Sequence, residues 1–416
     1  MNRKCVIIGG GIVGLCTAYY LIKEGHEVIV VDKGTDAEGA SYVNAGYITP
    51  SHVIPLSSPG IITKGLKWMF NSRSPFYVKP RLESNFLSWS WAFKKSATEA
   101  KVKKAIPVIK EINFLSRDLY ESMRAGGDFD FNYHRNGIFM CYKTEEAEKH
   151  ETYAADLAIK EGMDVRHCTL EEMKKMQPGV DYNLKGSFFY DCDGHMTPDD
   201  FMQQITTYLE KSGVTILRGK EVVDFNQSGN KVTKVELLGE VIDCDEVVIC
   251  SGVWTSGLVN KLGSKMLMEA GKGYSFNTYT STNMTIPCIL VDSKCAVTPM
   301  NGFTRFAGTM ELSGINKIIR KERVDAIADA ANSYFNHLKI TEEEKSKARS
   351  GLRPCTPDGL PYIGRLGNWK NVTVAAGHAM MGWSLAPATG KFVSEIISEQ
   401  PLSMDISPFS PERRFV

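Results

Sequence analysis

The sequence lacks the features of a membrane-spanning or nucleic-acid-binding chain. No stretch reaches the roughly 20 consecutive apolar residues that a membrane-spanning helix needs. Across 416 residues, 49 Lys and Arg balance 48 Asp and Glu, for a net charge of +1, which gives no support to nucleic acid as a partner. We expect a cytoplasmic protein whose first apolar run, residues 4–8, is a strand of the fold rather than a signal peptide.

Paired cysteines and internal repeats are also missing. The 10 cysteines are scattered along the chain and include no C-x-x-C pair, so we expect buried thiols in a reducing compartment, with no metal site. The shares of hydrophobic residues (43%) and charged residues (23%) are ordinary for a globular protein. At this length we expect two domains or one large α/β unit.

What the sequence does contain is a glycine-rich turn at its start. Residues 4–8 are apolar and β-branched, as in a buried parallel strand, and a G-x-G-x-x-G pattern follows at 9–14. Residues 12–24 read as a helix, and 27–31 as a second strand with Asp32 at its carboxyl end. Strand, turn, helix, strand and acid at these offsets predict a dinucleotide site.

Each part of this pattern has a physical role. Gly9 permits the tight turn, Gly11 lets a pyrophosphate approach the backbone, and Gly14 lets the helix lie close to the strand. Asp32 would accept hydrogen bonds from a ribose, while the helix N-terminus faces the phosphates. The residues assigned to this cofactor contact are Gly9, Gly11, Ile12, Val13, Gly14, Asp32 and Lys33. The pattern alone does not separate FAD from NAD.

Further elements follow from periodicity and caps. Helices are predicted over 108–123, 144–162, 197–213, 317–338 and 384–398, and a short one opens at a capping box at 169–172. Strands are predicted at 187–190, 214–217, 221–225, 231–237, 246–250 and 372–375, with a hairpin turn at 228–230. Residues 273–279, 288–291 and 303–307 look like antiparallel strands of a second sheet.

Four motifs in order carry a family resemblance. They are the 9–14 turn with Asp32, the S-x-x-N-A-G loop at 41–46, the G-L-R-P and T-P-D-G runs at 351–359, and Gly377-His378 before a helix. Together they resemble the FAD-dependent D-amino-acid oxidase superfamily. The nearest branch is that of the D-amino-acid dehydrogenases of the small-subunit type, with glycine and sarcosine oxidases as relatives.

The resemblance implies a two-domain α/β fold. A Rossmann-like FAD-binding domain, discontinuous in sequence, would comprise 1–58, 196–258 and 345–416. A substrate or cap domain of antiparallel sheet plus helices would comprise 59–195 and 259–344. FAD would be bound noncovalently and extended, with its isoalloxazine ring between the domains.

The resemblance also assigns further cofactor contacts. A loop would pass near the flavin, a strand backbone would read adenine, a turn would close over the pyrophosphate, and a helix N-terminus would meet the flavin pyrimidine edge. In that order the residues are Ser41, Asn44, Ala45 and Gly46; Val222; Ser251, Gly252 and Trp254; and Gly377, His378, Met381, Gly382, Trp383 and Ser384.

Arg353 is the residue predicted to bind substrate. A guanidinium fork binds an α-carboxylate through two hydrogen bonds, and Arg353 matches the arginine in the family's G-L-R-P run. Tyr274 is either a second ligand of that carboxylate or a buried structural tyrosine. His52 and His378 are either catalytic or structural.

The implied reaction is oxidation of a D-amino acid, with D-proline and hydroxy-D-proline as candidates, by hydride transfer from Cα to flavin N5. Electrons would pass to a quinone or another carrier. Alternatives are an oxidase producing hydrogen peroxide, an FAD-binding module without turnover, and an NAD-dependent dehydrogenase.

Residues 61–95 interleave aromatic side chains with Lys and Arg. Two interpretations stand: a peripheral contact with the inner face of the cell membrane, or aromatics packed inside the cap with the lysines in solvent.

Overall fold

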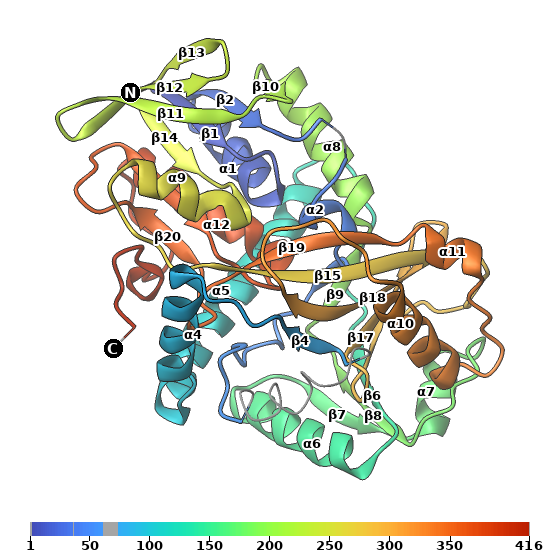
Figure 1. The fold of residues 1–416 in the computed structure, drawn as a ribbon. Coiled ribbons are helices and arrows are strands. Elements are labelled where there is room, and N and C mark those ends of the chain that lie inside the picture. Colours follow the sequence, from blue (N-terminus) through green and yellow to red (C-terminus); the bar gives the residue numbers. More distant parts are fainter. Residues whose placement is uncertain (1, 36, 61–73, 416) are drawn as a thin grey trace.

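Two large sheets organise the structure, one in each half of the molecule (Figure 1). The computed structural model describes residues 2–35, 37–60 and 74–415. The first sheet runs in the order β10-β2-β1-β14-β21-β20, parallel except between β20 and β21. Its strands are β1 (Lys4–Ile8), β2 (Glu27–Asp32), β10 (Thr215–Arg218), β14 (Glu246–Ile249), β20 (Tyr362–Arg365) and β21 (Val372–Ala376). Short apolar runs that are far apart in sequence therefore assemble into one buried sheet.

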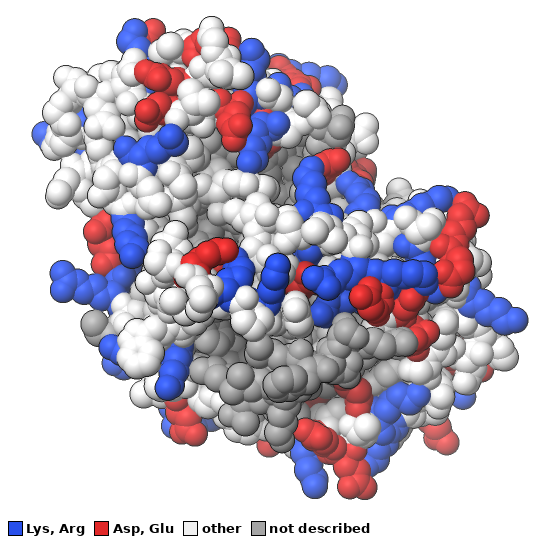
Figure 2. Space-filling model, in the orientation of Figure 1, with Lys and Arg blue, Asp and Glu red and all other residues white. Residues whose placement is uncertain are grey.

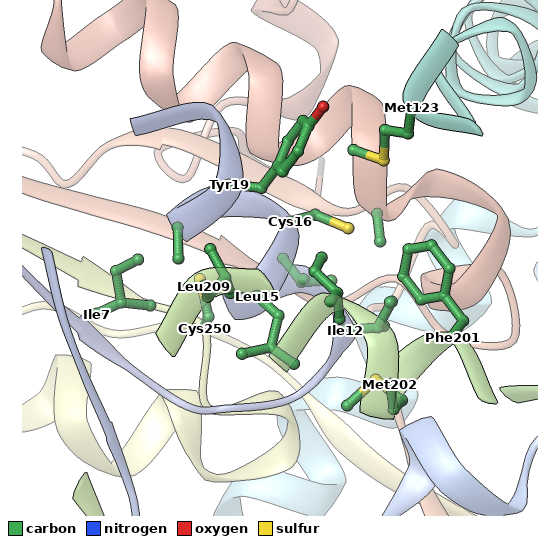
Figure 3. Close-up of a cluster of buried hydrophobic side chains, with 14 of the residues drawn as sticks. Ile7, Ile12, Leu15, Cys16, Tyr19, Met123, Phe201, Met202, Leu209 and Cys250 are labelled. Atoms are coloured by element: carbon green, nitrogen blue, oxygen red, sulfur yellow. The ribbon is translucent and has the colours of Figure 1, made fainter. Parts of the chain in front are cut away.

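Helices bury one face of this sheet. They are α1 (Ile12–Lys23), α5 (Glu99–Ala125), α8 (Pro198–Lys211) and α12 (Gly382–Ile397). In Figure 3, Leu15 and Cys16 of α1 lie among Phe201 and Met202 of α8, with Met123 of α5 nearby. A Cβ on Gly390 would lie 2.6 Å from the Cys16 carbonyl, so glycine sets the close crossing of α1 and α12.

The hairpin predicted around residue 229 is confirmed. It joins β11 (Val222–Ser228) to β12 (Lys231–Leu237), and β13 (Glu240–Asp243) completes a small antiparallel sheet. Gly229 has a φ of +60°, as a two-residue hairpin turn requires. After β14 come the 3₁₀ turn η1 (Gly252–Trp254) and α9 (Thr255–Lys261).

The second sheet runs β19-β15-β18-β17-β16-β6-β8-β7, with β4 added beside β18. Its strands are β4 (Phe76–Val78), β6 (Ile138–Tyr142), β7 (Val165–Cys168), β8 (Gly186–Tyr190), β15 (Glu269–Thr278), β16 (Cys288–Leu290), β17 (Cys295–Met300), β18 (Phe303–Leu312) and β19 (Arg349–Cys355). The antiparallel pairing expected in this sheet is confirmed for β15 with β18 and for β16 with β17, and the sheet also contains two parallel pairs, β16 with β6 and β18 with β4.

The shorter helices are α2 (Ala40–Val43), α6 (Glu145–Lys160), α7 (Leu170–Met176), α10 (Lys321–Tyr334) and α11 (Glu342–Ser346). A small sheet in the order β3-β9-β5 is formed by β3 (Tyr47–Ile48), β5 (Tyr133–His134) and β9 (Gly194–Met196). The 3₁₀ turn η2 (Ser407–Phe409) packs against β20 of the first sheet. The capping box at Thr169 is present. None of the described helices is long and apolar enough to cross a bilayer.

Two local predictions need correction. The helix predicted over 317–338 is shorter and spans Lys321–Tyr334, because the backbone is extended at Arg320 and at Phe335. Residues 76–78, within the stretch of interleaved aromatic and basic residues, form a strand paired with β18. Thr197 precedes α8 but does not cap it with its side chain, because its hydroxyl accepts the Asn301 N–H at 2.9 Å. Residues 61–73 of the aromatic stretch lie outside the described residues.

Candidate active site

The turn between β1 and α1 has the geometry of a phosphate cradle. Gly9 has a φ of +117°, and a Cβ on Gly14 would lie 1.9 Å from the Gly9 carbonyl oxygen, so both positions require glycine. The Asp32 carboxylate accepts the Gly10 N–H at 2.5 Å and the Gly34 N–H at 2.6 Å. Asp32 therefore shapes the turn while its remaining lone pairs stay available to a ribose.

The N-terminus of α1 opens into the same cavity. Gly11 stands at its N-cap without a side-chain cap, and the Ile12 N–H donates to Ser41 Oγ at 2.9 Å. A Cβ on Gly11 would meet only Ser41 Oγ, at 3.1 Å, so this glycine leaves open space for a ligand rather than for another element. Val13, in the first turn, also lines the cavity, with backbone N–H groups that an anion can use.

The loop from Ser41 to Gly46 is held rigidly beneath the second sheet. Asn44 donates to the Ser41 carbonyl at 2.8 Å and accepts the Gly46 N–H at 2.7 Å. Gly46 has a φ of +70°, and a Cβ there would lie 2.1 Å from the Met196 carbonyl. The Ala45 carbonyl accepts the Thr298 hydroxyl at 2.8 Å. The residues of this motif are therefore needed to hold the loop in its conformation, and in that conformation the loop lines the cavity.

The far end of the cavity holds the residues expected near adenine and the pyrophosphate. Val222 begins β11 and lines the cavity. Lys33 Nζ lies 3.9 Å from the centre of the Trp254 ring, a cation–π contact at the rim. Ser251 shares a hydrogen bond with the Thr255 hydroxyl at 3.2 Å, and Gly252 has a φ of +56°.

The N-terminus of α12 forms another wall. Met381 is its N-cap and Gly382 its first residue, and both line the cavity. Ser384 accepts the Thr49 N–H at 2.9 Å and donates to the Tyr47 carbonyl at 3.1 Å, which ties this helix end to β3. The Trp383 carbonyl accepts the Tyr120 hydroxyl at 2.7 Å. The unpaired N–H groups of this first turn face the cavity with the positive end of the helix dipole.

His378 is a structural histidine in this geometry. It is buried, and its Nε2 lies 2.9 Å from the Thr389 hydroxyl, which itself donates to the Leu385 carbonyl. Nε2 is therefore the donor, and burial lowers the ring pKa to about 3. Gly377 before it has a φ of +83°, and a Cβ there would lie 2.5 Å from Thr356 Cγ2.

Arg353 is a half-buried cation without a carboxylate partner among the described residues. Its guanidinium packs against Gly273, where a Cβ would lie 2.3 Å from Nη1. Its one hydrogen bond within the described part of the chain runs from Nη1 to the Thr309 carbonyl at 2.8 Å, and its side chain lines the cavity. Burial lowers the pKa of Arg353 below its usual value. Most of the fork is therefore free for an anion.

Tyr274 also lines the cavity, and of its two interpretations the contacts of its hydroxyl favour the structural one. Alternation along β15 puts Gly271 and Gly273 on the Arg353 face and Tyr274 on the opposite face. There its hydroxyl donates to Glu311 at 2.7 Å, and burial raises its pKa. Lys272 lies 3.2 Å from the same carboxylate, so the face carries a buried ion pair.

His52 lines the cavity and is tied to a buried carboxylate. Its Nδ1 lies 3.2 Å from Ser51 Oγ, and that hydroxyl donates to Asp193 at 2.5 Å. Ser51 N–H also donates to Asp193 at 3.0 Å. Burial lowers the pKa of His52 to about 4 and raises that of Asp193 to about 7.

Sequence reasoning missed Thr309 and Asp193. Thr309 lies in a bulge of β18, where the register against β15 shifts, and has a φ of +69°, rare for a β-branched residue. This conformation aims its carbonyl at Arg353. Asp193 lies in a loop between two strands, and only its pairing with residue 51 shows its role. No local pattern marks either residue.

All these features meet in one cavity of about 1870 Å³. It extends from the glycine turn and Val222, past the N-termini of α1 and α12, to Arg353. A drug-sized ligand fills roughly 300–1,000 Å³, so this cavity has room for an extended dinucleotide and a second molecule. The described residues include no group of three or more His, Cys, Asp or Glu placed to hold a metal ion. The fold and site thus define a dinucleotide-dependent protein with an arginine in its cavity wall that has no carboxylate partner among the described residues.

Comparison with known proteins identifies the dinucleotide. A family model described as DAO, FAD dependent oxidoreductase, matches residues 4–396. A D-amino acid dehydrogenase of Helicobacter pylori is 30% identical over 401 residues, covering 95% of each chain. Another from Vibrio vulnificus (strain CMCP6) is 30% identical over 416 residues, covering 97% of this chain and 99% of that one. The crystal structure of glycine oxidase from Geobacillus kaustophilus superposes with a TM-score of 0.78 at 21% identity, covering 99% of both chains. The chain belongs to the DAO family of FAD-dependent oxidoreductases, and FAD is its cofactor.

Proposed function

We propose that the protein is an FAD-dependent dehydrogenase that oxidises a D-amino acid to an imino acid, which water converts to a 2-oxo acid. The observation that carries this proposal is Arg353 in the cavity wall, half-buried, whose guanidinium has a carbonyl but no carboxylate partner among the described residues. An uncompensated cation in a cavity wall calls for an anionic ligand. The relatives named D-amino acid dehydrogenase supply the substrate class.

The chain's residues bind and orient in this scheme. Arg353 holds the substrate carboxylate through two hydrogen bonds, with Thr309 fixing the fork. FAD, when bound, supplies the two-electron chemistry. The N-terminus of α12 lines the cavity and would stabilise negative charge on the bound cofactor, and the apolar wall would exclude water. The protein's task is to position the substrate carbon, which a misplaced carboxylate would prevent.

The cofactor contacts and the domain division are part of the proposal. FAD would lie noncovalently along the cavity, with its pyrophosphate at α1 and its adenine near Val222. The FAD-binding domain would comprise 1–58, 196–258 and 345–416, and the remainder would form the cap. The test of the substrate class is a dye-linked assay over D-amino acids, D-proline and hydroxy-D-proline. Faster turnover of the L-enantiomers would contradict the proposal.

Electrons would pass to a quinone or another carrier. The alternative is an oxidase, and the glycine oxidase neighbour shares the fold. Oxygen consumption with and without a dye acceptor separates the two. A module without turnover would have no reason to keep the Arg353 cation in its cavity.

A membrane contact would suit such an acceptor, and the helix α4 (Ser84–Ser96) offers a face for it. Leu87 and Trp91, one turn apart, are 51% and 59% exposed, and Lys94 and Lys95 lie over the Trp91 ring. Trp89, in contrast, is buried and donates to the Cys355 carbonyl at 2.8 Å. The packed interpretation therefore holds for Trp89, and we propose the membrane interpretation for the opposite face of α4.

The membrane proposal predicts binding to anionic vesicles that weakens with salt. Changing Leu87 and Trp91 to Ser should reduce that binding while leaving dye-linked turnover unchanged. The net charge of +1 and the interspersed signs in Figure 2 provide no general attraction to lipid, so the contact should depend on this face. Equal vesicle binding by the variant would contradict the proposal.

A further inference from the structure

The cavity continues past Arg353 into a part that the reaction does not require. This part, which we call the distal lobe, lies between α5, α6 and the second sheet. Its apolar wall comprises Val53, Ile54, Val102, Ile106, Met140, Leu157 and Ile289. Polar side chains interrupt this wall, and they include Glu151 of α6, His52 and Lys294.

Glu151 is a buried carboxylate in this wall. It is 3% exposed, and its one charged partner among the described residues is the adjacent His150, whose Nδ1 lies 3.0 Å from Oε1. The His150 side chain is itself 50% exposed. A carboxylate taken out of water with so little compensation is costly unless a ligand supplies hydrogen-bond donors or a positive charge.

His52 presents a second acceptor to the same lobe. Because Ser51 donates its hydroxyl proton to Asp193, its oxygen accepts from His52 Nδ1–H. Nδ1 is therefore the protonated ring nitrogen, which leaves Nε2 as an acceptor. Burial lowers the pKa of His52, which agrees with a neutral ring, while the Glu151 carboxylate opposes that shift and the Lys294 charge adds to it. Two acceptors in one wall suit a group with several protons and do not suit the carbonyl oxygens of a quinone.

The sheet order sets the distance from this wall to Arg353. The Arg353 fork is bonded to β18, whereas α6 packs against β6 and β8. Two strands, β17 and β16, lie between β18 and β6, so these strands are about 14 Å apart. The Arg353 and Glu151 side chains both extend into the cavity, so a ligand that contacts both would need to span on the order of 10 Å.

From this geometry, and resting on the proposed function, we propose that Glu151 and His52 bind a cationic group at the end of a long substrate side chain. The preferred substrate class would be D-amino acids whose side chains end in an amine or a guanidinium. Short cyclic imino acids such as D-proline would leave the distal lobe unfilled. The role assigned to Glu151 is specificity, with no part in the redox step.

The experiment uses ligands that the holoenzyme cannot oxidise at an α-amine. A series from 4-aminobutanoate to 8-aminooctanoate is compared with alkanoates of equal length, by perturbation of the flavin spectrum and by competitive inhibition. In the unmodified enzyme, the longer amino-terminated ligands should bind at least about tenfold more tightly than their alkanoates. Glu151→Gln, an isosteric change, should remove this advantage while changing alkanoate affinity by less than about twofold. The matched control Glu146→Gln, on the exposed face of α6, should alter neither affinity.

Two results would overturn the proposal: no advantage for the amino-terminated ligands at any length, or equal weakening of both series by Glu151→Gln. The proposed function is tested separately by the alkanoates, whose binding should depend on Arg353. Alkanoate affinity that is unchanged in Arg353→Leu would contradict the carboxylate site without altering the amine comparison. D-lysine against D-norleucine, assayed in both Glu151→Gln and the unmodified enzyme, gives a second readout in turnover.

Discussion

Replacing Arg353 by Leu should remove most substrate affinity while leaving the cofactor in place. The guanidinium lies in the cavity wall and makes a single hydrogen bond to the described residues, from Nη1 to Thr309, so the remaining donors serve the ligand. Losing a charge-assisted, two-bond contact costs on the order of 3 kcal/mol, or about 100-fold in kcat/KM. Leu removes a half-buried charge that has no carboxylate partner among the described residues, so the variant should still fold.

The assay is dye-linked turnover as a function of D-amino acid concentration, with the flavin-to-protein absorbance ratio as the control for cofactor content. Arg353→Lys should fall between Leu and Arg, because it keeps the charge but loses the fork. An Arg353→Leu variant with full FAD content and an unchanged kcat/KM would refute the carboxylate role. Loss of FAD from the variant would refute it too, because Arg353 would then be a cofactor residue.

Three further expectations concern the scaffold. Thr309→Gly should keep the residue-309 carbonyl directed at Arg353 and remove the backbone strain of a φ of +69°. The KM for substrate should therefore be unchanged, and the free energy of unfolding in urea should be equal or higher by up to about 1 kcal/mol. A raised KM would contradict the role of this carbonyl in orienting Arg353. Gly11→Val should give folded, colourless protein, whereas Gly14→Ala should impair folding itself, because the added Cβ would lie 1.9 Å from the Gly9 carbonyl oxygen. Circular dichroism measures folding and the flavin absorbance measures cofactor content, so the two outcomes can be separated. Full flavin content in Gly11→Val would contradict the assignment of residues 9–14 to the cofactor. Asp193 has a folded-state pKa raised to about 7 from an unfolded value of about 4, so its stabilising contribution is present below pH 4 and lost as pH rises through 7. Asp193→Asn should therefore raise Tm more at pH 8 than at pH 5, and an equal shift at both would contradict the burial argument.

Sequence was sufficient where structure is local. The turn at 9–14 and the hairpin at Gly229 depend on the backbone freedom of glycine within a few residues, and the structure shows that freedom in use. The capping box at Thr169 is equally local. The family resemblance, which rested on the order of four motifs along the chain, is confirmed by a family model that matches residues 4–396.

Sequence was insufficient where a side chain's partner is distant. The sequence left Tyr274 as either a ligand of the carboxylate or a structural tyrosine, and the alternation of β15 and the carboxylate of Glu311, 37 residues away, favour the structural role. His378 is a motif residue whose role depends on Thr389 in the following helix. In each case the residue type indicated a possible role, but the sequence did not show where the side chain points, because that is set by strand register and by packing.

The same limit applies to the second sheet. Parallel pairing of β16 with β6 joins segments about 150 residues apart, and neither segment has a sequence pattern that predicts a parallel partner strand. The Thr309 bulge shifts the register of β18 beside the site, and its sequence reads as an ordinary strand. These non-local features are the ones that position Arg353.

The most direct test of the central claim is anaerobic reduction of the bound flavin by substrate. The protein should be yellow as purified, and addition of a panel of D-amino acids without oxygen or dye should bleach its visible flavin absorption. Bleaching should be much faster for at least one D-amino acid than for its L-enantiomer, and Arg353→Leu should require far higher concentrations. If dithionite bleaches the flavin but no D-amino or D-imino acid does, the proposed function is wrong.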